Sequence, residues 1–210
     1  MISIEKSHKT YPNHPTRAFL LALEDVLGKN GVNALLRIAN LQGWIDTYPA
    51  ENFEREVDLS EFSSINAALD EIYGSRGSHG LARRASKSAF DLTWKQHGAL
   101  GDLQTAEIDS LPAQTRNKEG LAVFAKVLSA TSDLECDVQE EDNIILFRVQ
   151  NCPVCWGRES SSPTCQGFVG LLEGCLLWLG SGKGFEVTEK ECSAAGGEAC
   201  TFSINKVPVG

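Results

Sequence analysis

The distribution of cysteine most constrains what this chain can fold into. The sequence holds seven cysteines, and none precedes Cys136. Six lie between Cys152 and Cys200, beginning with a Cys-x-x-Cys pair. A single cysteine is most often a small buried hydrophobic residue, but six in one short stretch are typical of a metal site or of reactive thiols. The fold is therefore expected to bring several of these cysteines together.

The remaining composition is that of an ordinary globular protein. The chain has 210 residues, of which 42% are hydrophobic and 22% are charged, enough for a core without disulfides or metals. The net charge is −9 and neither half is basic, which excludes a nucleic-acid partner. The sequence shows no signal peptide and no run of ~20 apolar residues, so we expect a cytoplasmic protein. In a reducing compartment, clustered cysteines are more often metal ligands than disulfides.

Hydrophobic periodicity predicts an α+β fold with a helical N-terminal half. Helices are expected over 15–28, 31–41, 60–72, 81–97 and 113–130, with a glycine-rich interruption at 74–80. An antiparallel sheet with a packed helix is expected from strands at 134–138, 144–149, 185–190 and 200–204 and a helix at 164–179. Residues 1–110 and 111–206 are expected to share one core, with a candidate boundary at 98–112.

The predicted elements separate two cysteines from the rest. Cys165 and Cys175 lie ten residues apart on one predicted helix, which is about 15 Å of helical rise. They cannot bind the same ion. Cys175 falls on the apolar face of that helix and Cys136 opens a strand, so we expect both in the core.

The other five cysteines are candidate metal ligands. Cys192 and Cys200 flank a loop between strands that are expected to pair, which brings them together. Cys165 can join them from the first turn of its helix. The fourth ligand is expected to be Cys152, with Cys155 as the alternative, and spacing does not decide between them. A different arrangement uses both of these with Cys192 and Cys200 and leaves Cys165 in the core.

A pattern of cysteine, glycine and glutamate runs through the C-terminal part. It consists of Cys165, Gly170, Glu173 and Gly174, followed by Glu189, Cys192, Gly196, Cys200 and Phe202. This pattern resembles the 4-vinyl reductase domain family over about residues 110–206. The stretch from Tyr73 to Leu81 resembles the N-terminal part of cyanobacterial members.

The resemblance implies a fold and a metal. The fold would be that of 4-vinyl reductase domains and of TRAPP-type vesicle-tethering subunits, and the metal would be zinc. Cys165, Cys192 and Cys200 match the family's cysteine ligands, and Cys152 would replace its upstream glutamate. Glu189 matches a family glutamate, either as a ligand or as a solvated or hydrogen-bonding strand residue.

The resemblance also implies a function. The expected protein is non-catalytic and binds a hydrophobic small molecule, a chlorophyll-type tetrapyrrole, during photosystem assembly or pigment handling. It would act as a homodimer or heterodimer or with another protein partner, in the cytoplasm or at the cytoplasmic face of the thylakoid membrane. Candidate pigment-binding residues are His79, in the glycine-rich stretch, and Trp94, whose flat ring suits a tetrapyrrole.

Two alternative functions remain open at this point. One is a vinyl reductase, or an accessory subunit, in (bacterio)chlorophyll synthesis. No glycine motif follows a predicted strand, so the chain lacks a dinucleotide fingerprint for the reductase. The other is a cysteine-based redox or iron–sulfur sensor.

Overall fold

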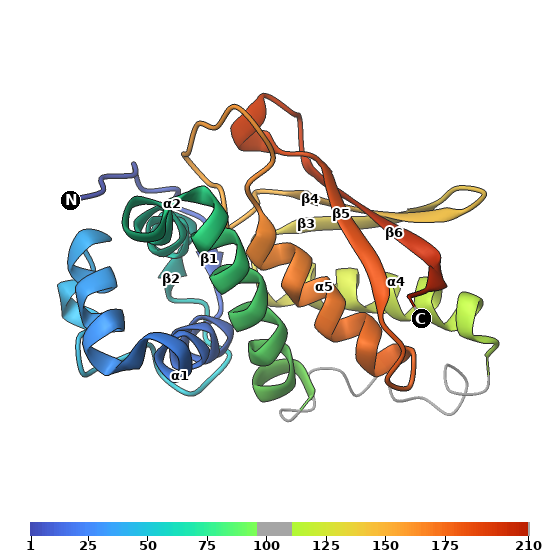
Figure 1. The fold of residues 1–210 in the computed structure, drawn as a ribbon, viewed down its shortest axis with the longest axis horizontal. Helices are drawn as coiled ribbons and strands as arrows, with labels where there is room; N and C mark the ends of the chain where they lie inside the picture. The colour runs from blue at the N-terminus through green and yellow to red at the C-terminus, as the bar shows by residue number, and fades with distance from the viewer. Residues whose placement is uncertain (96–110, 210) are drawn as a thin grey trace.

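The computed structural model describes residues 1–95 and 111–209. The ambiguous stretch 101–110, most of the candidate boundary at 98–112 and the end of the helix expected at 81–97 lie outside these residues. Figure 1 shows a helical layer beside a sheet, with α5 between them, and the sheet has four strands. The helices are α1 (Asn13–Ile38), η1 (Gln42–Trp44), α2 (Leu59–Phe90), η2 (Asp91–Lys95), α4 (Ala113–Thr131), α5 (Gln166–Leu179) and η4 (Ser193–Ala195). The strands are β1 (Thr10–Tyr11), β2 (Val57–Asp58), β3 (Glu135–Glu140), β4 (Ile144–Gln150), β5 (Phe185–Glu191) and β6 (Cys200–Pro208).

The large sheet is fully antiparallel, with the strand order β3-β4-β6-β5. Alternate residues of β4 are buried, and Phe147 pairs with Phe202 of β6 beneath Phe168 of α5. Both α4 and α5 contact this sheet. The predicted α+β class is confirmed, and the four expected strands are all present.

The two long helices each contain one break at a glycine. Gly28 in α1 has φ 70° and ψ 162°, and Gly74 in α2 has φ 65° and ψ 163°. Both lie in a region of backbone space that only glycine enters readily. The interruption of the helix that the sequence predicted over 74–80 is confirmed only at Gly74. Gly77 and Gly80 lie within the helix.

Helix α5 packs between the helical layer and the sheet (Figure 1). A Cβ atom added at Gly170 would lie 2.0 Å from the carbonyl oxygen of Arg83 in α2. Only glycine permits so close an approach between the two helix backbones. The hydrophobic core is continuous from α1 to β6, so the helical layer and the sheet are packed as one body.

Helix α2 begins at a complete capping box. The Asp58 side chain accepts a hydrogen bond from the N–H of Ser60, and Glu61 accepts one from the N–H of Asp58. Asp58 also accepts from the N–H and hydroxyl of Ser7, in the segment before β1. One carboxylate thus fixes both the start of α2 and the N-terminal segment.

Candidate functional site

Three chain segments meet at the end of the sheet where β6 begins. Cys152 and Cys155 lie in the loop after β4, Cys165 immediately precedes α5, and Cys192 and Cys200 flank the hairpin between β5 and β6. The register explains the meeting, because Val149 of β4 pairs directly with Cys200. The chain that leaves β4 therefore passes beside the start of β6.

The hairpin has a backbone shape that places its two cysteines together. The N–H groups of Ala195 and Gly197 both donate to the carbonyl of Cys192, at 2.9 and 3.0 Å. Gly196 lies between them with φ 89°, a backbone conformation that residues other than glycine rarely adopt. The turn thus folds tightly around the backbone carbonyl of Cys192.

The five sulfur atoms form one buried group, named the cysteine cluster below. The Sγ–Sγ distances are 3.7 Å for Cys152–Cys165, 3.4 Å for Cys155–Cys200, 3.7 Å for Cys165–Cys192 and 3.6 Å for Cys165–Cys200. No member of the cluster is more than 3% exposed. A tetrahedral ion with metal–sulfur bonds of about 2.3 Å separates its sulfurs by about 3.8 Å. The observed distances are close to that spacing and far longer than a disulfide bond.

The structure therefore brings together every cysteine proposed as a ligand. Cys152 and Cys155 lie in one group of four ligand atoms with Cys165 and Cys200, so distance does not choose one of them over the other. Cys192 lies in a second group with Cys165, Glu189 and Cys200, so the expected set of four is not gathered as one group. Cys175 is buried farther along α5, outside the cluster, as expected. Cys136 is half-buried rather than fully buried in β3.

Glu189 also faces the cluster, from β5. Its side chain is 6% exposed, and its Oε2 accepts a hydrogen bond of 2.7 Å from the N–H of Cys165. The solvated role that the sequence left open is therefore wrong. The alternation of Phe185, Val187 and Glu189 along β5 is the sequence signal that placed this carboxyl on the inner face.

Burial and crowding shift the ionisation of these groups. Burial raises the pKa of Cys165, while hydrogen bonds from its sulfur neighbours, Cys152 first, hold the pKa of Cys200 well below its usual range. The pKa of Cys192 falls to about 6 through hydrogen bonds from Cys155 and Cys165. Burial, then repulsion from Cys192, raises the pKa of Glu189 to about 9. Burial thus opposes negative charge on Cys165 and Glu189, and a bound cation would favour it.

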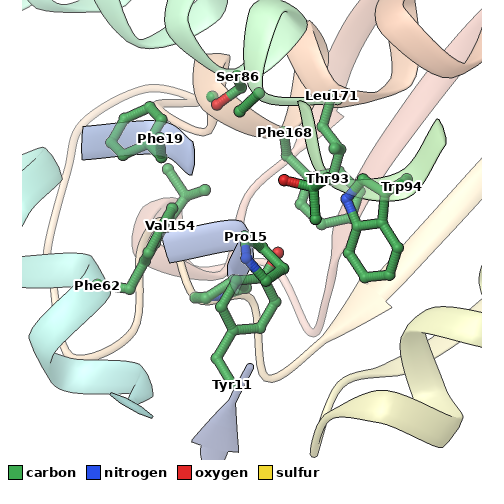
Figure 2. A pocket seen from close by; sticks show the side chains of 13 residues that line it. Tyr11, Pro15, Phe19, Phe62, Ser86, Thr93, Trp94, Val154, Phe168 and Leu171 are labelled. Atoms are coloured by element: carbon green, nitrogen blue, oxygen red, sulfur yellow. The ribbon is translucent and has the colours of Figure 1, made fainter. Parts of the chain in front are cut away.

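A separate apolar cavity lies between the start of α1, α2 and α5. Figure 2 shows Phe19, Phe62 and Phe168 among the side chains that enclose it. Its volume is about 30 Å³, which is room for one or two water-sized molecules. It is far smaller than the pockets that hold organic cofactors.

The two predicted pigment-binding residues lie in different places. Trp94 lines the apolar cavity, with its ring centroid 5.5 Å from that of Phe124 (Figure 2). His79 is half-buried, and its Nε2 lies 3.4 Å from Thr164 Oγ1 in a pocket of about 10 Å³. The structure therefore does not bring them together, and a cofactor role for either stays a prediction.

No known protein-family profile and no curated protein sequence matches the chain. By structure, the chain is similar to H-NOX domains. An Fe(II) unliganded H-NOX variant from K. algicida has a TM-score of 0.58 at 14% identity, over 95% of this chain and 97% of that one. The H-NOX domain of Shewanella woodyi in its Fe(II)CO state has a TM-score of 0.53 at 19% identity, over 94% and 95%. A third, from work on heme distortion in the H-NOX family, has a TM-score of 0.57 at 16% identity, over 95% and 97%.

This likeness corrects the family expected from the sequence pattern. The similar structures are H-NOX domains, not 4-vinyl reductase domains or TRAPP-type subunits. The α+β class holds, but the two named folds were wrong. The motif that suggested them consists of a few cysteines, glycines and glutamates, and it does not determine how the helical layer packs.

The same likeness overturns the expected function and cofactors. The structures of the similar proteins are described with heme or Fe(II). The predicted cofactors, zinc and a chlorophyll-type tetrapyrrole, were therefore wrong. The predicted roles in photosystem assembly and pigment handling were wrong as well. The likeness likewise counts against both alternatives, the vinyl reductase and the redox or iron–sulfur sensor. Thylakoid association has no support, and no helix in the described part of the chain is long and apolar enough to cross a membrane.

Proposed function

We propose that this chain is a metal-binding domain whose cysteine cluster holds a sulfur-preferring metal ion. Two sets of four ligands are close enough for this: Cys152, Cys155, Cys165 and Cys200, or Cys165, Glu189, Cys192 and Cys200. One observation carries the proposal: five sulfurs, each at most 3% exposed, are linked into one group by four contacts of 3.4–3.7 Å. Cysteines that only fill a core contact carbon atoms, and they have no reason to gather around one point. Soft thiolate ligands select soft or borderline metal ions.

The role of such an ion is structural. Four protein ligands leave no open position for a substrate, in contrast to catalytic metal sites. The ligands come from the loop after β4, the residue before α5 and the end of β5 with the β5–β6 hairpin, so one ion joins segments that lie far apart in the sequence. Because the unfolded chain has no preformed site, the free energy of metal binding adds to that of folding.

Metal entry has a route in the fold. A surface hollow of about 600 Å³ is lined by Cys152, Cys155 and Ser193. The cluster is therefore buried but lies directly beneath the surface.

A matched pair of variants tests the proposal. Cys165→Ala removes a thiol immediately before α5 and Cys175→Ala removes one within α5, but only Cys165 belongs to the cluster. We expect purified wild-type protein and Cys175→Ala to carry metal by elemental analysis, and Cys165→Ala to lose it and melt at a lower temperature. Wild-type protein that folds normally without metal would refute the proposal.

Heme binding is a second candidate, because the fold is that of H-NOX domains. The described residues do not fit a heme. The apolar cavity holds about 30 Å³, and of the described side chains that line it only Tyr11 is of a type that ligates heme iron. We therefore assign no step of this protein's chemistry to heme. Titration with hemin, followed by visible absorption, tests the candidate; a saturable spectral shift at one equivalent would support it.

The other expectations stay proposals. These are the division at residue 110, a cytoplasmic location, a hydrophobic ligand touching His79 or Trp94, and a homodimer or protein partner. Size-exclusion chromatography with light scattering tests the oligomeric state directly.

A further inference from the structure

Two groups of four ligand atoms overlap in the cluster. One group consists of Cys152, Cys155, Cys165 and Cys200, and the other of Cys165, Glu189, Cys192 and Cys200; within each, all ligand atoms lie within 4.8 Å of one another. The sulfurs of Cys165 and Cys200, 3.6 Å apart, belong to both groups.

A single ion leaves acidic groups buried beside it. An ion in the first group leaves Cys192, with its sulfur 3.7 Å from that of Cys165, and the Glu189 carboxyl without a role. An ion in the second group leaves Cys152 and Cys155, which are 2% and 3% exposed. Buried acidic groups beside a centre of net negative charge are costly unless something pairs with them.

The carboxyl of Glu189 supplies an independent sign of a second ion. Its Oε2 accepts the N–H of Cys165, but its Oε1 is buried and has no hydrogen-bond partner among the described residues. Buried polar atoms are almost always paired, so such an atom calls for a ligand. Oε1 belongs to a side chain that faces three sulfurs, as a metal ligand would.

We propose that the cluster holds two metal ions that share the thiolates of Cys165 and Cys200 as bridges. Cys152 and Cys155 complete the first ion's ligands, and Cys192 and Glu189 complete the second's. In a four-membered ring of two metals and two sulfurs with bonds of about 2.3 Å, the bridging sulfurs lie about 3.5 Å apart, close to the observed 3.6 Å. This inference rests on the metal binding proposed above, and it gives every acidic group in the cluster a role.

Stoichiometry separates this inference from the proposed function. Native mass spectrometry of the purified full chain is expected to show two metal ions per chain. One ion per chain would overturn the bridged pair and leave the metal-binding proposal standing. No metal at all would overturn both.

Variants test which residues hold the second ion. Glu189→Gln and Cys192→Ser are expected to retain one ion. Glu191→Gln, an exposed carboxyl on the same strand, is expected to keep two. Equal metal content in Glu189→Gln and the wild type would overturn the role of Glu189.

Cobalt(II) substitution tests the bridges themselves. Two cobalt ions joined by shared thiolates couple their spins, so the electron paramagnetic resonance signal per cobalt should be weaker in the wild type than in Glu189→Gln. Equal signals per ion would overturn the bridged arrangement. A substitution that prevents folding does not affect the stoichiometry measured on the wild type.

Discussion

Arg83 of α2 and Glu173 of α5 form a two-pronged ion pair, with Nε 3.0 Å from Oε2 and Nη2 2.6 Å from Oε1. The Glu173 side chain is 16% exposed, and that of Arg83 is 42%. The hydrogen bond to Glu173 raises the pKa of Arg83. The pair ties the two central helices together next to the close approach at Gly170.

Glu173→Gln should lower the free energy of unfolding by about 1 kcal/mol, because the pair is bidentate but partly screened by solvent. Urea denaturation monitored by tryptophan fluorescence measures this change. Asp46→Asn, which breaks the exposed pair between Lys29 and Asp46, is the control and should leave stability unchanged. Equal effects of the two substitutions would show that the central pair has no special role.

Gly170→Ala should be among the most damaging single-methyl additions in this fold. The new Cβ would lie 2.0 Å from the carbonyl oxygen of Arg83, so the two helix backbones must separate. We expect a loss of about 3 kcal/mol, at the upper end of overpacking effects. Gly80→Ala is the matched control, because its Cβ would meet nothing within 4 Å, and it should stabilise α2 by about 0.5–1 kcal/mol. Thermal unfolding by circular dichroism distinguishes the two, and a Gly170→Ala protein as stable as the wild type would contradict the close packing.

Asp58 should make stability depend on acid pH. Burial alone raises the pKa of this carboxyl, but hydrogen bonds from Ser60 and Ser7 outweigh it and lower the pKa from 3.8 to about 2. The contribution is therefore fully present above the unfolded value of 3.8 and is lost as the pH falls through about 2.

The Asp58→Ala variant should lose about 1 kcal/mol at neutral pH, as is typical of a removed helix cap. Its deficit against the wild type should shrink between pH 4 and 2, within the interval set by those two pKa values. Asp58→Asn retains a capping side chain but cannot titrate, so its deficit should be smaller than that of Asp58→Ala at neutral pH and should shrink over the same pH interval. Urea denaturation at a series of pH values measures all three proteins, and a deficit that stays constant with pH would rule out the carboxylate as its source.

Removal of metal should expose the cluster to alkylation. In the metal-loaded protein, iodoacetamide should spare the cluster. The half-buried Cys136, whose pKa burial raises to about 12, should react slowly and at the same rate before and after chelation. After treatment with a chelator, the cluster cysteines should react, since the ligands are released and the segments that carry them loosen. Peptide mapping by mass spectrometry gives the modified positions, with Cys136 as the internal control. Unchanged protection of the cluster after chelation would indicate that packing alone shields it.

Local patterns predicted most of the elements but not their assembly. The period of 3.6 residues located α4 and α5, and alternation located β4 and β5, because each signal is complete within a short segment. The pairing of the last two strands then brought Cys192 and Cys200 together correctly. The packing of α5 against α2 depends on contacts between residues far apart in the sequence, such as Gly170 and Arg83. No local sequence pattern predicts such contacts.

The candidate site, too, could be predicted only in part from local sequence patterns. The membership of Cys165 could be predicted from its place at the start of a helix. The part played by Cys152 and Cys155 could not, because both lie in a loop whose path has no periodicity and is fixed only when β4 pairs with β6. The family was misread for a related reason: cysteine and glycine spacing describes the neighbourhood of the cluster, and the arrangement of α1 and α2 lies outside it.

The three-segment origin of the cluster has a consequence for the protein's synthesis. At about 5–20 residues per second, Cys200 leaves the ribosome about 2–10 s after Cys152. During that interval the nascent chain carries a Cys-x-x-Cys pair and no hairpin to complete the site. The thiols are then open to oxidation or to binding of another ion. If the cluster binds metal as proposed, correct loading requires that the metal be available when the hairpin closes.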